Sequence, residues 1–154
     1  MAFNAFTGDE TGLLKSINIS DKRWSCFGGS VQSRNLGCIS MAWNDPSETS
    51  ENKFFTVLRR NSTVDYYKLG GEKMEEDDEE GVPKEGIVEK LAEFSIENFL
   101  NPGGCAMVGS PKDLSTMFFT NTGQVSIVKT NDRCLGAHET VRFDARGPIS
   151  AGSV

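Results

Sequence analysis

The residues best suited to metal chemistry in this sequence are Cys134 and His138, which are separated by three residues. His138 is the only histidine of the chain, so acid–base designs that rely on a pair of histidines are excluded. A zinc site would need two further ligands from distant cysteines, whereas structural zinc sites use closely spaced ligand pairs. We therefore expect no metal site and no cofactor. A small metal-dependent enzyme built on Cys134 and His138 stands as an alternative.

Other catalytic patterns are missing or incomplete in the sequence. It contains no Gly-x-Ser-x-Gly elbow that would present a nucleophilic serine. Gly104 and Gly109 have the spacing of a phosphate-binding loop, but Ser110 stands where that loop requires a lysine. Residues 105–108 are apolar and predict a buried strand instead. We expect that the protein is not an enzyme.

The 154-residue chain has a formal net charge of −6, and its excess acidity lies in one run. Residues 75–80 are six successive acids, and the other 16 acidic residues equal the 16 lysines and arginines in number. Like charges repel one another and stay solvated, so we expect an acidic disordered loop at about residues 71–86. A basic partner for this run is the alternative. The sequence has no basic stripe, and no direct sequence-specific binding of nucleic acid is expected.

Length and apolar content predict one domain, residues 1–154, and no contact with a membrane. The length is within the usual range of a single domain. No run approaches the roughly 18 apolar residues of a membrane span. The first six residues lack the basic and apolar regions of a secretory signal, which predicts a cytosolic or nuclear protein. In such a compartment disulfides are not expected, and Cys38 and Cys105, which lie in apolar stretches, are expected in the core.

Apolar and polar residues alternate along much of the chain, which is typical of half-buried β-strands. The segments with this pattern or with a short apolar run are residues 13–19, 39–44, 54–58, 64–69, 117–120 and 125–128. Asn121-Thr122-Gly123 between the last two predicts a hairpin. Residues 87–100 fit both a helix and a strand, and we favour a strand for part of them. The sequence therefore predicts an all-β fold.

One unit recurs in these strands. A Gly-Cys strand is followed by a Phe-Phe-Thr strand, a turn and a third strand, once from Gly37-Cys38 and once from Gly104-Cys105. Residues 6–15 repeat the hairpin part of the unit. Recurring four-stranded units suggest a β-propeller, and a closed ring of about seven blades needs about 300 residues. We expect an incomplete propeller of about two to three WD40-like blades, a fragment of a seven-bladed one.

The opening hairpin resembles that of a known family. Residues 8–18, and above all Glu10-Thr11-Gly12-Leu13-Leu14-Lys15, resemble the first hairpin of the WD repeat-containing protein 74 family of nucleolar ribosome-biogenesis factors. Residues 37–43 and 61–64 resemble the family's next blade, and residues 121–125 the turn of the one after. The resemblance extends over residues 3–131. The Trp-Asp dipeptide and the Gly-His doublet of a standard WD repeat are absent from the sequence.

The resemblance implies a non-catalytic propeller scaffold in assembly of the large ribosomal subunit and in rRNA processing. It implies a location in the nucleus, in the nucleolus. Its expected partners are proteins of the pre-60S ribosomal particle and an AAA-type ATPase. A generic WD-repeat module for protein–protein interaction, in signalling or as a ubiquitin ligase adaptor, is the alternative function.

Propellers bind partners through loops, so the predicted hairpin tips are the candidate contact sites. The adjacent arginines of one tip favour a phosphate or an acidic partner, although hairpin tips are exposed whether or not they bind anything. A merely solvated turn is therefore the alternative. The candidate contact residues are Asp9, Glu10, Arg59, Arg60, Asn61, Asn121 and Thr122.

Overall fold

The computed structural model describes residues 4–43, 53–69, 88–96, 98–110, 113–129 and 140–144. These residues form β-strands and one short 3-10 helix, and none of them is in an α-helix, so the all-β prediction is confirmed. The elements are β1 (Asn4–Gly8), β2 (Leu14–Asn18), β3 (Arg23–Phe27), η1 (Arg34–Leu36), β4 (Cys38–Trp43), β5 (Lys53–Arg59), β6 (Thr63–Leu69), β7 (Val88–Ser95), β8 (Pro102–Ser110), β9 (Asp113–Thr120), β10 (Gln124–Lys129) and β11 (Thr140–Asp144).

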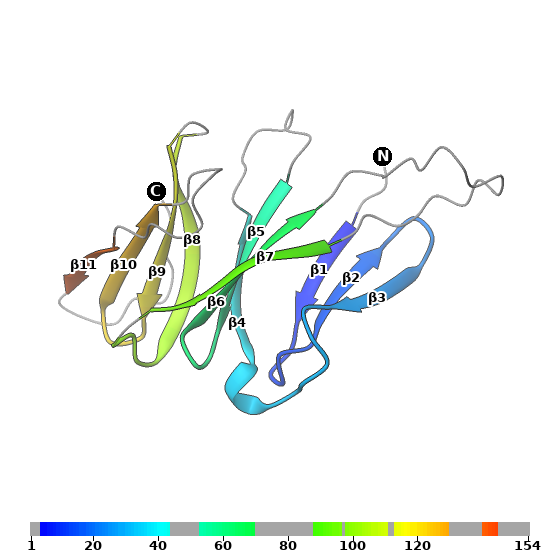
Figure 1. Ribbon diagram of the computed structural model, residues 1–154, viewed down its shortest axis with the longest axis horizontal. Coiled ribbons are helices and arrows are strands. Elements are labelled where there is room, and N and C mark those ends of the chain that lie inside the picture. The colour runs from blue at the N-terminus through cyan, green and yellow to red at the C-terminus, as the bar shows by residue number, and fades with distance from the viewer. Residues whose placement is uncertain are drawn as a thin grey trace.

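The strands form three antiparallel sheets in chain order (Figure 1). Sheet A has the order β1-β2-β3, sheet B has the order β4-β5-β6-β7, and sheet C has the order β8-β9-β10-β11. Every strand pairs with the next one along the chain inside its sheet. The three sheets follow one another across the molecule, and sheet B lies between the other two (Figure 1).

Each strand predicted from alternation is present. Residues 88–95 form strand β7, so the choice of a strand for part of residues 87–100 is confirmed. Residues 105–108 lie within strand β8, as expected from their apolar character. Strands β3 and β11 were not predicted. None of the described residues forms a helix long and apolar enough to cross a membrane.

Two apolar cores hold the sheets together. One lies between sheets B and C and contains Leu58, Val64, Tyr66, Ile96, Phe99, Cys105, Phe118 and Val128. The other lies between sheets A and B and contains Leu14, Phe55, Val57 and Tyr67, with Phe6, Phe27, Cys38, Met41 and Val88 packed against them. Cys105 is buried and Cys38 is half-buried against the second core, so their expected place in the core is confirmed.

The three sheets share one turn. It comprises residues 9–12 between β1 and β2, residues 59–62 between β5 and β6, and residues 120–123 between β9 and β10. In each, the fourth N–H donates to the first carbonyl, at 3.1, 3.0 and 3.2 Å. The fourth residue has a positive φ each time: 89° at Gly12, 65° at Ser62 and 96° at Gly123. This is the pattern of a three-residue hairpin loop, a type I turn followed by a left-handed residue.

The shared turn corrects the register of the predicted repeat. When the turns are matched, Phe118-Phe119-Thr120 corresponds to Val57-Leu58-Arg59, three residues beyond the predicted match with Phe54-Phe55-Thr56. The first strands of sheets B and C share an irregularity in their pairing. The register shifts between Cys38 and Ser40 in β4 and between Pro102 and Gly104 in β8. Met41, and not Cys38, is therefore the counterpart of Cys105. The predicted alignment of the two repeats by residue type was wrong, because equivalent residues are those with the same place in the strand pairing.

Two expectations fall on residues outside those described. They are the acidic loop at residues 71–86, and Cys134 and His138 of the metal hypothesis.

Candidate partner-binding edge

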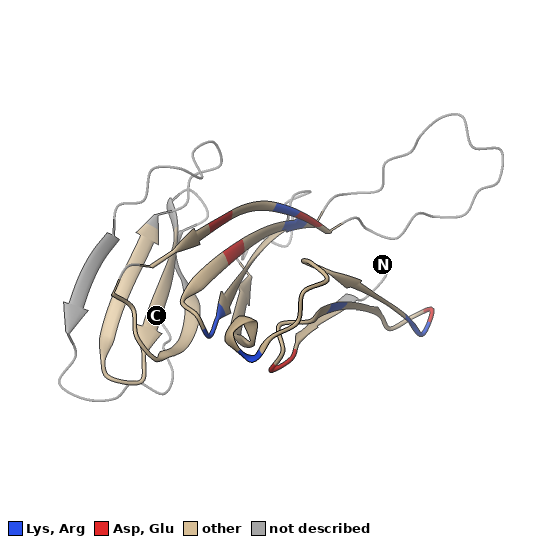
Figure 2. Ribbon diagram, turned by 60° about the horizontal axis from the view of Figure 1, so that its bottom comes forward, with Lys and Arg blue, Asp and Glu red and all other residues tan. Residues whose placement is uncertain are grey.

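The candidate contact residues all belong to turns at one end of the sheets. We call this end the loop edge, and it comprises residues 9–12, 28–37, 59–62, 98–101 and 120–123. It lies along the bottom of Figure 1, where η1 and the three equivalent turns are found. Charged residues of both signs occur along it (Figure 2), including Asp9, Glu10, Arg34 and Arg60.

Asp9 is exposed, but its carboxylate is used by its own turn. Oδ1 accepts hydrogen bonds from the Thr11 N–H at 2.9 Å, the Thr11 hydroxyl at 2.8 Å and the Leu13 N–H at 3.0 Å. Aspartate begins turns for this reason, since its side chain bonds the backbone a few residues on. The hydroxyl of Thr11, followed by the backbone donors, holds the pKa of Asp9 below its usual value.

Thr120 does the same work at the matching position of sheet C. Its hydroxyl accepts the Gln124 N–H at 2.9 Å and lies 2.9 Å from the Thr122 hydroxyl. These contacts repeat those that Asp9 makes with Leu13 and Thr11. Thr122 and Asn121 are exposed beside it. In these two hairpins the side chain at the first turn position therefore closes the turn, and on sheet C Asn121 and Thr122 remain exposed.

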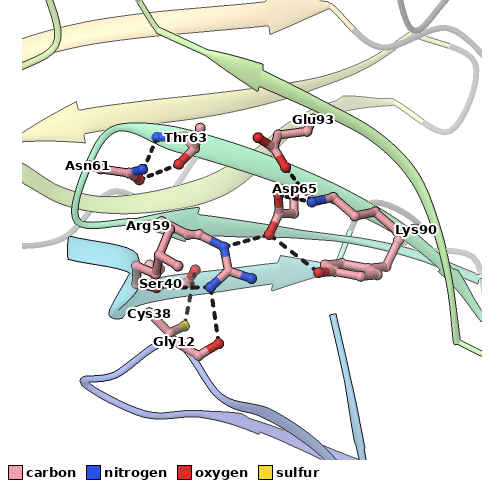
Figure 3. A network of polar contacts seen from close by, with 11 residues as sticks. Gly12, Cys38, Ser40, Arg59, Asn61, Thr63, Asp65, Lys90 and Glu93 are labelled. Carbon is pink, nitrogen blue, oxygen red and sulfur yellow. Dashed lines mark hydrogen bonds and ion pairs between the residues drawn. The ribbon is translucent and has the colours of Figure 1, made fainter. Parts of the chain in front are cut away.

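Arg59 corrects the prediction of an exposed arginine pair. It occupies the first turn position in sheet B but is only 5% exposed. Its Nε donates to Asp65 Oδ2 at 2.5 Å, and its Nη1 donates to the carbonyls of Gly12 at 3.1 Å and Leu36 at 2.9 Å (Figure 3). The guanidinium is drawn inward because Asp65 and these two carbonyls together satisfy it. Arg59 therefore ties sheet A and η1 to sheet B, while Arg60 is exposed as expected.

Asp65 is the centre of a buried polar cluster (Figure 3). Besides Arg59, its Oδ2 accepts the Tyr67 hydroxyl at 3.3 Å, and its Oδ1 lies 2.9 Å from Lys90 Nζ. Burial lowers the pKa of Arg59, but the hydrogen bond to Asp65 and the charge of Asp65 have the larger combined effect. The pKa of Arg59 is therefore raised. Burial, then the Asp65 charge, raise the pKa of Tyr67 to about 12. In this cluster Asp65 is contacted by Arg59, Tyr67 and Lys90, and Lys90 also pairs with Glu93.

Backbone hydrogen bonds join the turns into one surface. The N–H groups of Arg60 and Asn61 donate to the carbonyls of Gly37 and Asn35 at 2.9 and 3.0 Å. The Ile96 N–H donates to the Ser62 carbonyl at 3.1 Å. The Asn121 N–H donates to the Asn101 carbonyl at 3.0 Å. Glu10, Arg60, Asn61, Asn121 and Thr122 are thus exposed side chains on a continuously bonded backbone.

Two apolar side chains on the loop edge were missed by sequence reasoning. Val31 precedes η1 and is 73% exposed, and Leu100 precedes β8 and is 72% exposed. Their signal is visible in the sequence, because each is a large aliphatic residue inside a segment rich in turn formers. They add apolar area to an otherwise polar candidate surface.

Two of the cysteines in the described part of the chain, Cys38 and Cys105, have thiols that resist deprotonation. Burial raises the pKa of the Cys105 thiol to about 11 and also raises that of Cys38. A reactive cysteine needs the opposite, a thiolate at neutral pH. No group of three or more metal-ligating side chains occurs among the residues that the structure describes.

No protein-family model and no curated protein matches this chain.

Proposed function

We propose that this chain is part of a β-propeller that acts as a non-catalytic scaffold in assembly of the large ribosomal subunit and in rRNA processing. The observation that best supports the propeller proposal is the recurrence of one structural unit in sheets A, B and C. The same turn, with the same left-handed residue, joins equivalent strands in all three. The same register shift marks β4 and β8.

The packing of the sheets supports the same proposal. β4 lies beside β8, so the first strands of sheets B and C are neighbours. Sheet B buries apolar side chains against both other sheets. Propellers repeat four-stranded sheets around a centre in this way, with each sheet packed on the next.

The loop edge supports a docking role. Its buried polar groups bond within the fold, whereas Glu10, Arg60, Asn61, Asn121 and Thr122 are exposed. The apolar side chains of Val31 and Leu100 lie among them. Polar groups around a few apolar anchors are typical of protein-binding surfaces.

The ribosomal assignment rests on the resemblance of residues 8–18 and the weaker ones after it. On that basis the partners are pre-60S particle proteins and an AAA-type ATPase, met in the nucleolus of the nucleus. A general WD-repeat interaction module is the second candidate, because the docking surface alone does not select a ribosomal partner.

Sedimentation of a tagged full-length chain from cell extract tests this proposal. We expect the chain to travel with large-subunit precursors in a sucrose gradient. The double variant Arg60→Glu with Asn121→Lys should reduce the co-sedimenting fraction about fivefold, since truncation of a contributing interface residue costs about 1 kcal/mol or more. Lys22→Glu is the matched control, because Lys22 is an exposed residue of the β2–β3 turn, at the opposite end of the sheets.

The outcomes separate the two candidates and the enzyme alternative. A chain that never enters precursor fractions, yet captures other proteins through the loop edge, would favour the general interaction module. Equal loss in the control variant would remove the loop edge as the docking surface. Stoichiometric zinc in the purified chain that is lost in the variants Cys134→Ser and His138→Ala would favour the alternative of a metal-dependent enzyme.

A further inference from the structure

Folding brings together a different pair of arginines from the pair that is adjacent in the sequence. Arg59 is buried, whereas Arg60 is exposed on the β5–β6 turn and Arg34 is exposed on η1. The Asn61 N–H donates to the Asn35 carbonyl at 3.0 Å, so η1 and this turn are neighbouring segments of the loop edge. Each segment presents one arginine to solvent.

These two arginines keep their charge available at the surface. The ion pairs within the described part of the chain all belong to the buried cluster around Asp65, and neither Arg34 nor Arg60 takes part in them. A guanidinium group binds a carboxylate through two parallel N–H donors, which gives a strong and directed contact. Two guanidinium groups on adjoining, hydrogen-bonded segments are therefore suited to the carboxylates of one acidic segment.

The next segment of the loop edge adds an apolar side chain. The Ser62 hydroxyl donates to the Phe99 carbonyl, so Leu100, which is 72% exposed, lies on the other side of the β5–β6 turn from η1. Hydrogen-bonded neighbouring segments are about 4.8 Å apart. Two such steps, about 10 Å, are spanned by about four extended residues. One short peptide can therefore reach from η1 to Leu100.

The β1–β2 turn restricts where the acids of such a peptide can lie. Glu10 is exposed on this turn, and its carbonyl packs beside η1, since a Cβ on Gly37 would be 2.5 Å from the Glu10 carbonyl oxygen. The loop edge thus changes from acidic at the β1–β2 turn to basic at η1 and the β5–β6 turn (Figure 2). Complementary charges fix the position of a bound segment, so its acids lie over the arginines and away from Glu10.

The same surface is poorly suited to nucleic acid. A phosphate backbone is bound by a series of cations, whereas the two arginines are flanked by Glu10 on one side and by Leu100 on the other. The bases of single strands stack on aromatic side chains. Phe99 is the one aromatic residue of the loop edge, and it is only 4% exposed.

The acidic run of this chain is attached at the far end of sheet B. Residues 75–80 follow β6, which begins at Thr63 beside the loop edge and ends at Leu69, and they precede β7, which begins at Val88. β6 has seven residues, so its far end is about 20 Å from the loop edge at about 3.4 Å per residue. The strand ends that hold the run are remote from the two arginines, which favours a separate polypeptide as the occupant.

We propose that Arg34, Arg60 and Leu100 form a docking site for an acidic peptide segment of a partner protein. The arginines bind the carboxylates of the segment, and Leu100 packs against an apolar side chain about two residues from them. Glu10 excludes acids from the neighbouring position. This inference names the partner chemistry of the loop edge and rests on the proposed docking role of that edge. It does not depend on the ribosomal assignment.

Thermophoresis of the full chain with synthetic peptides tests the proposal. One probe contains two glutamates, a glycine and a leucine in succession, a second probe has the reverse order, and the control peptides carry glutamine in place of each glutamate. The chain is labelled at its N-terminus and kept dilute, so that self-association does not interfere. Measurements are made at about 0.15 M salt, where the screening length is about 8 Å. We expect saturable binding of at least one probe and much weaker binding of its control.

Charge variants of the chain should change this binding in opposite directions. Arg34→Glu and Arg60→Glu should each weaken probe binding about tenfold, and Leu100→Ser about fivefold. Glu10→Lys should strengthen it about threefold. Lys22→Glu is the matched control, because it changes the net charge as much as either arginine variant but lies in the β2–β3 turn at the opposite end of the sheets. It should leave probe binding unchanged.

Each contrary result has a defined meaning. Equal binding of probe and control peptides, or equal losses in the arginine variants and in Lys22→Glu, would overturn the proposal. Tighter binding of a short oligouridylate than of the probe would overturn it in favour of a phosphate-binding surface. A marked gain in probe affinity when residues 75–80 are replaced by serine would also overturn it, since the acids of this chain would then occupy the site. Probe binding needs no ribosomal precursor, so this test and the sedimentation test can fail independently.

Discussion

At the scale of single residues, the buried pair of Arg59 and Asp65 joins parts of the chain that are far apart in sequence. Removing charges from water is costly, and the cost is offset only when hydrogen bonds satisfy the ions. Arg59 meets this condition with three acceptors, and Asp65 with Arg59, Tyr67 and Lys90. The pair is therefore a clamp between sheets A and B, and its loss should reduce stability more than the loss of any exposed charge.

The neighbouring arginines offer a matched test of this clamp. Arg59→Met should lower the free energy of unfolding by about 3 kcal/mol, because it leaves the Asp65 carboxylate buried without its strongest partner. Arg60→Met, one residue away and exposed, should change it by less than about 0.5 kcal/mol. Urea unfolding at protein concentrations without association measures both. Equal effects of the two substitutions would show that Arg59 is not a clamp.

Buried Cys105 predicts a loss of stability at alkaline pH. Its pKa is raised from 9.0 to about 11 in the folded chain, so above pH 9 the unfolded chain releases the proton first. The stabilisation is complete below pH 9 and is lost as the pH rises toward 11. Cys105→Ala should remove this part of the pH dependence, which unfolding curves at pH 8 and pH 11 would reveal. A variant whose stability falls with pH as steeply as the parent would contradict the assignment.

The burial of Arg59 shows why site prediction from sequence succeeds only in part. The turns around Asp9, Asn61 and Asn121 are visible in the sequence, because turn formers separate apolar runs. The inward direction of Arg59 depends on Asp65 and on two carbonyls far away in the chain, at Gly12 and Leu36. Proximity of that kind is created by folding and leaves no local pattern.

At the scale of elements, the repeated turn organises the fold. Its fourth position needs a left-handed backbone, which glycine adopts without the steric cost of a Cβ. Gly12 also lies against η1, since a Cβ there would be 2.5 Å from the Leu36 carbonyl oxygen. Ser62 takes the same conformation and has its hydroxyl bonded to the Phe99 carbonyl. In sheets A and B the turn thus joins the hairpin to the loop that leads to the next sheet.

Gly12 and Gly29 separate backbone strain from close packing. Both have a positive φ, 89° and 118°, but a Cβ at Gly29 would meet nothing within 4 Å. Gly29→Ala should cost about 1 kcal/mol from conformational strain alone. Gly12→Ala should cost about 3 kcal/mol or more, because the fixed Leu36 carbonyl must also move. Thermal unfolding compares them, and a cost at Gly29 as large as that at Gly12 would refute the packing of the turn on η1.

The strands that were predicted and those that were missed differ in burial. β5 and β6 face a core, and their apolar residues make a clear pattern. β3 has four exposed residues out of five, so no buried face imposes alternation on it. The repeat itself was recognisable, but its register was not. Register depends on which residues pair across strands. The extra residue in β4 and in β8 changes this pairing, so an alignment by residue type alone cannot recover it.

At the scale of the whole molecule, the two outer sheets each leave one face without a described partner. On sheet A the cross-strand row Ala5, Ile17 and Trp24 points away from sheet B, and Trp24 is 65% exposed. On sheet C the row Ala106, Met117 and Ile127 occupies the corresponding outer face. Further propeller blades would cover both rows. Large exposed apolar patches are rare on soluble monomers and mark association.

Light scattering of the purified 154-residue chain, combined with thermal unfolding, tests the central claim that these three sheets belong to a larger ring. We expect self-association or aggregation that increases with protein concentration, with a mass above that of one chain. Replacing Ile17 and Trp24 by threonine should lower this association, because it removes apolar area from the outer face of sheet A. A monodisperse monomer with a sharp cooperative unfolding transition would contradict the account and would identify a self-contained small β domain.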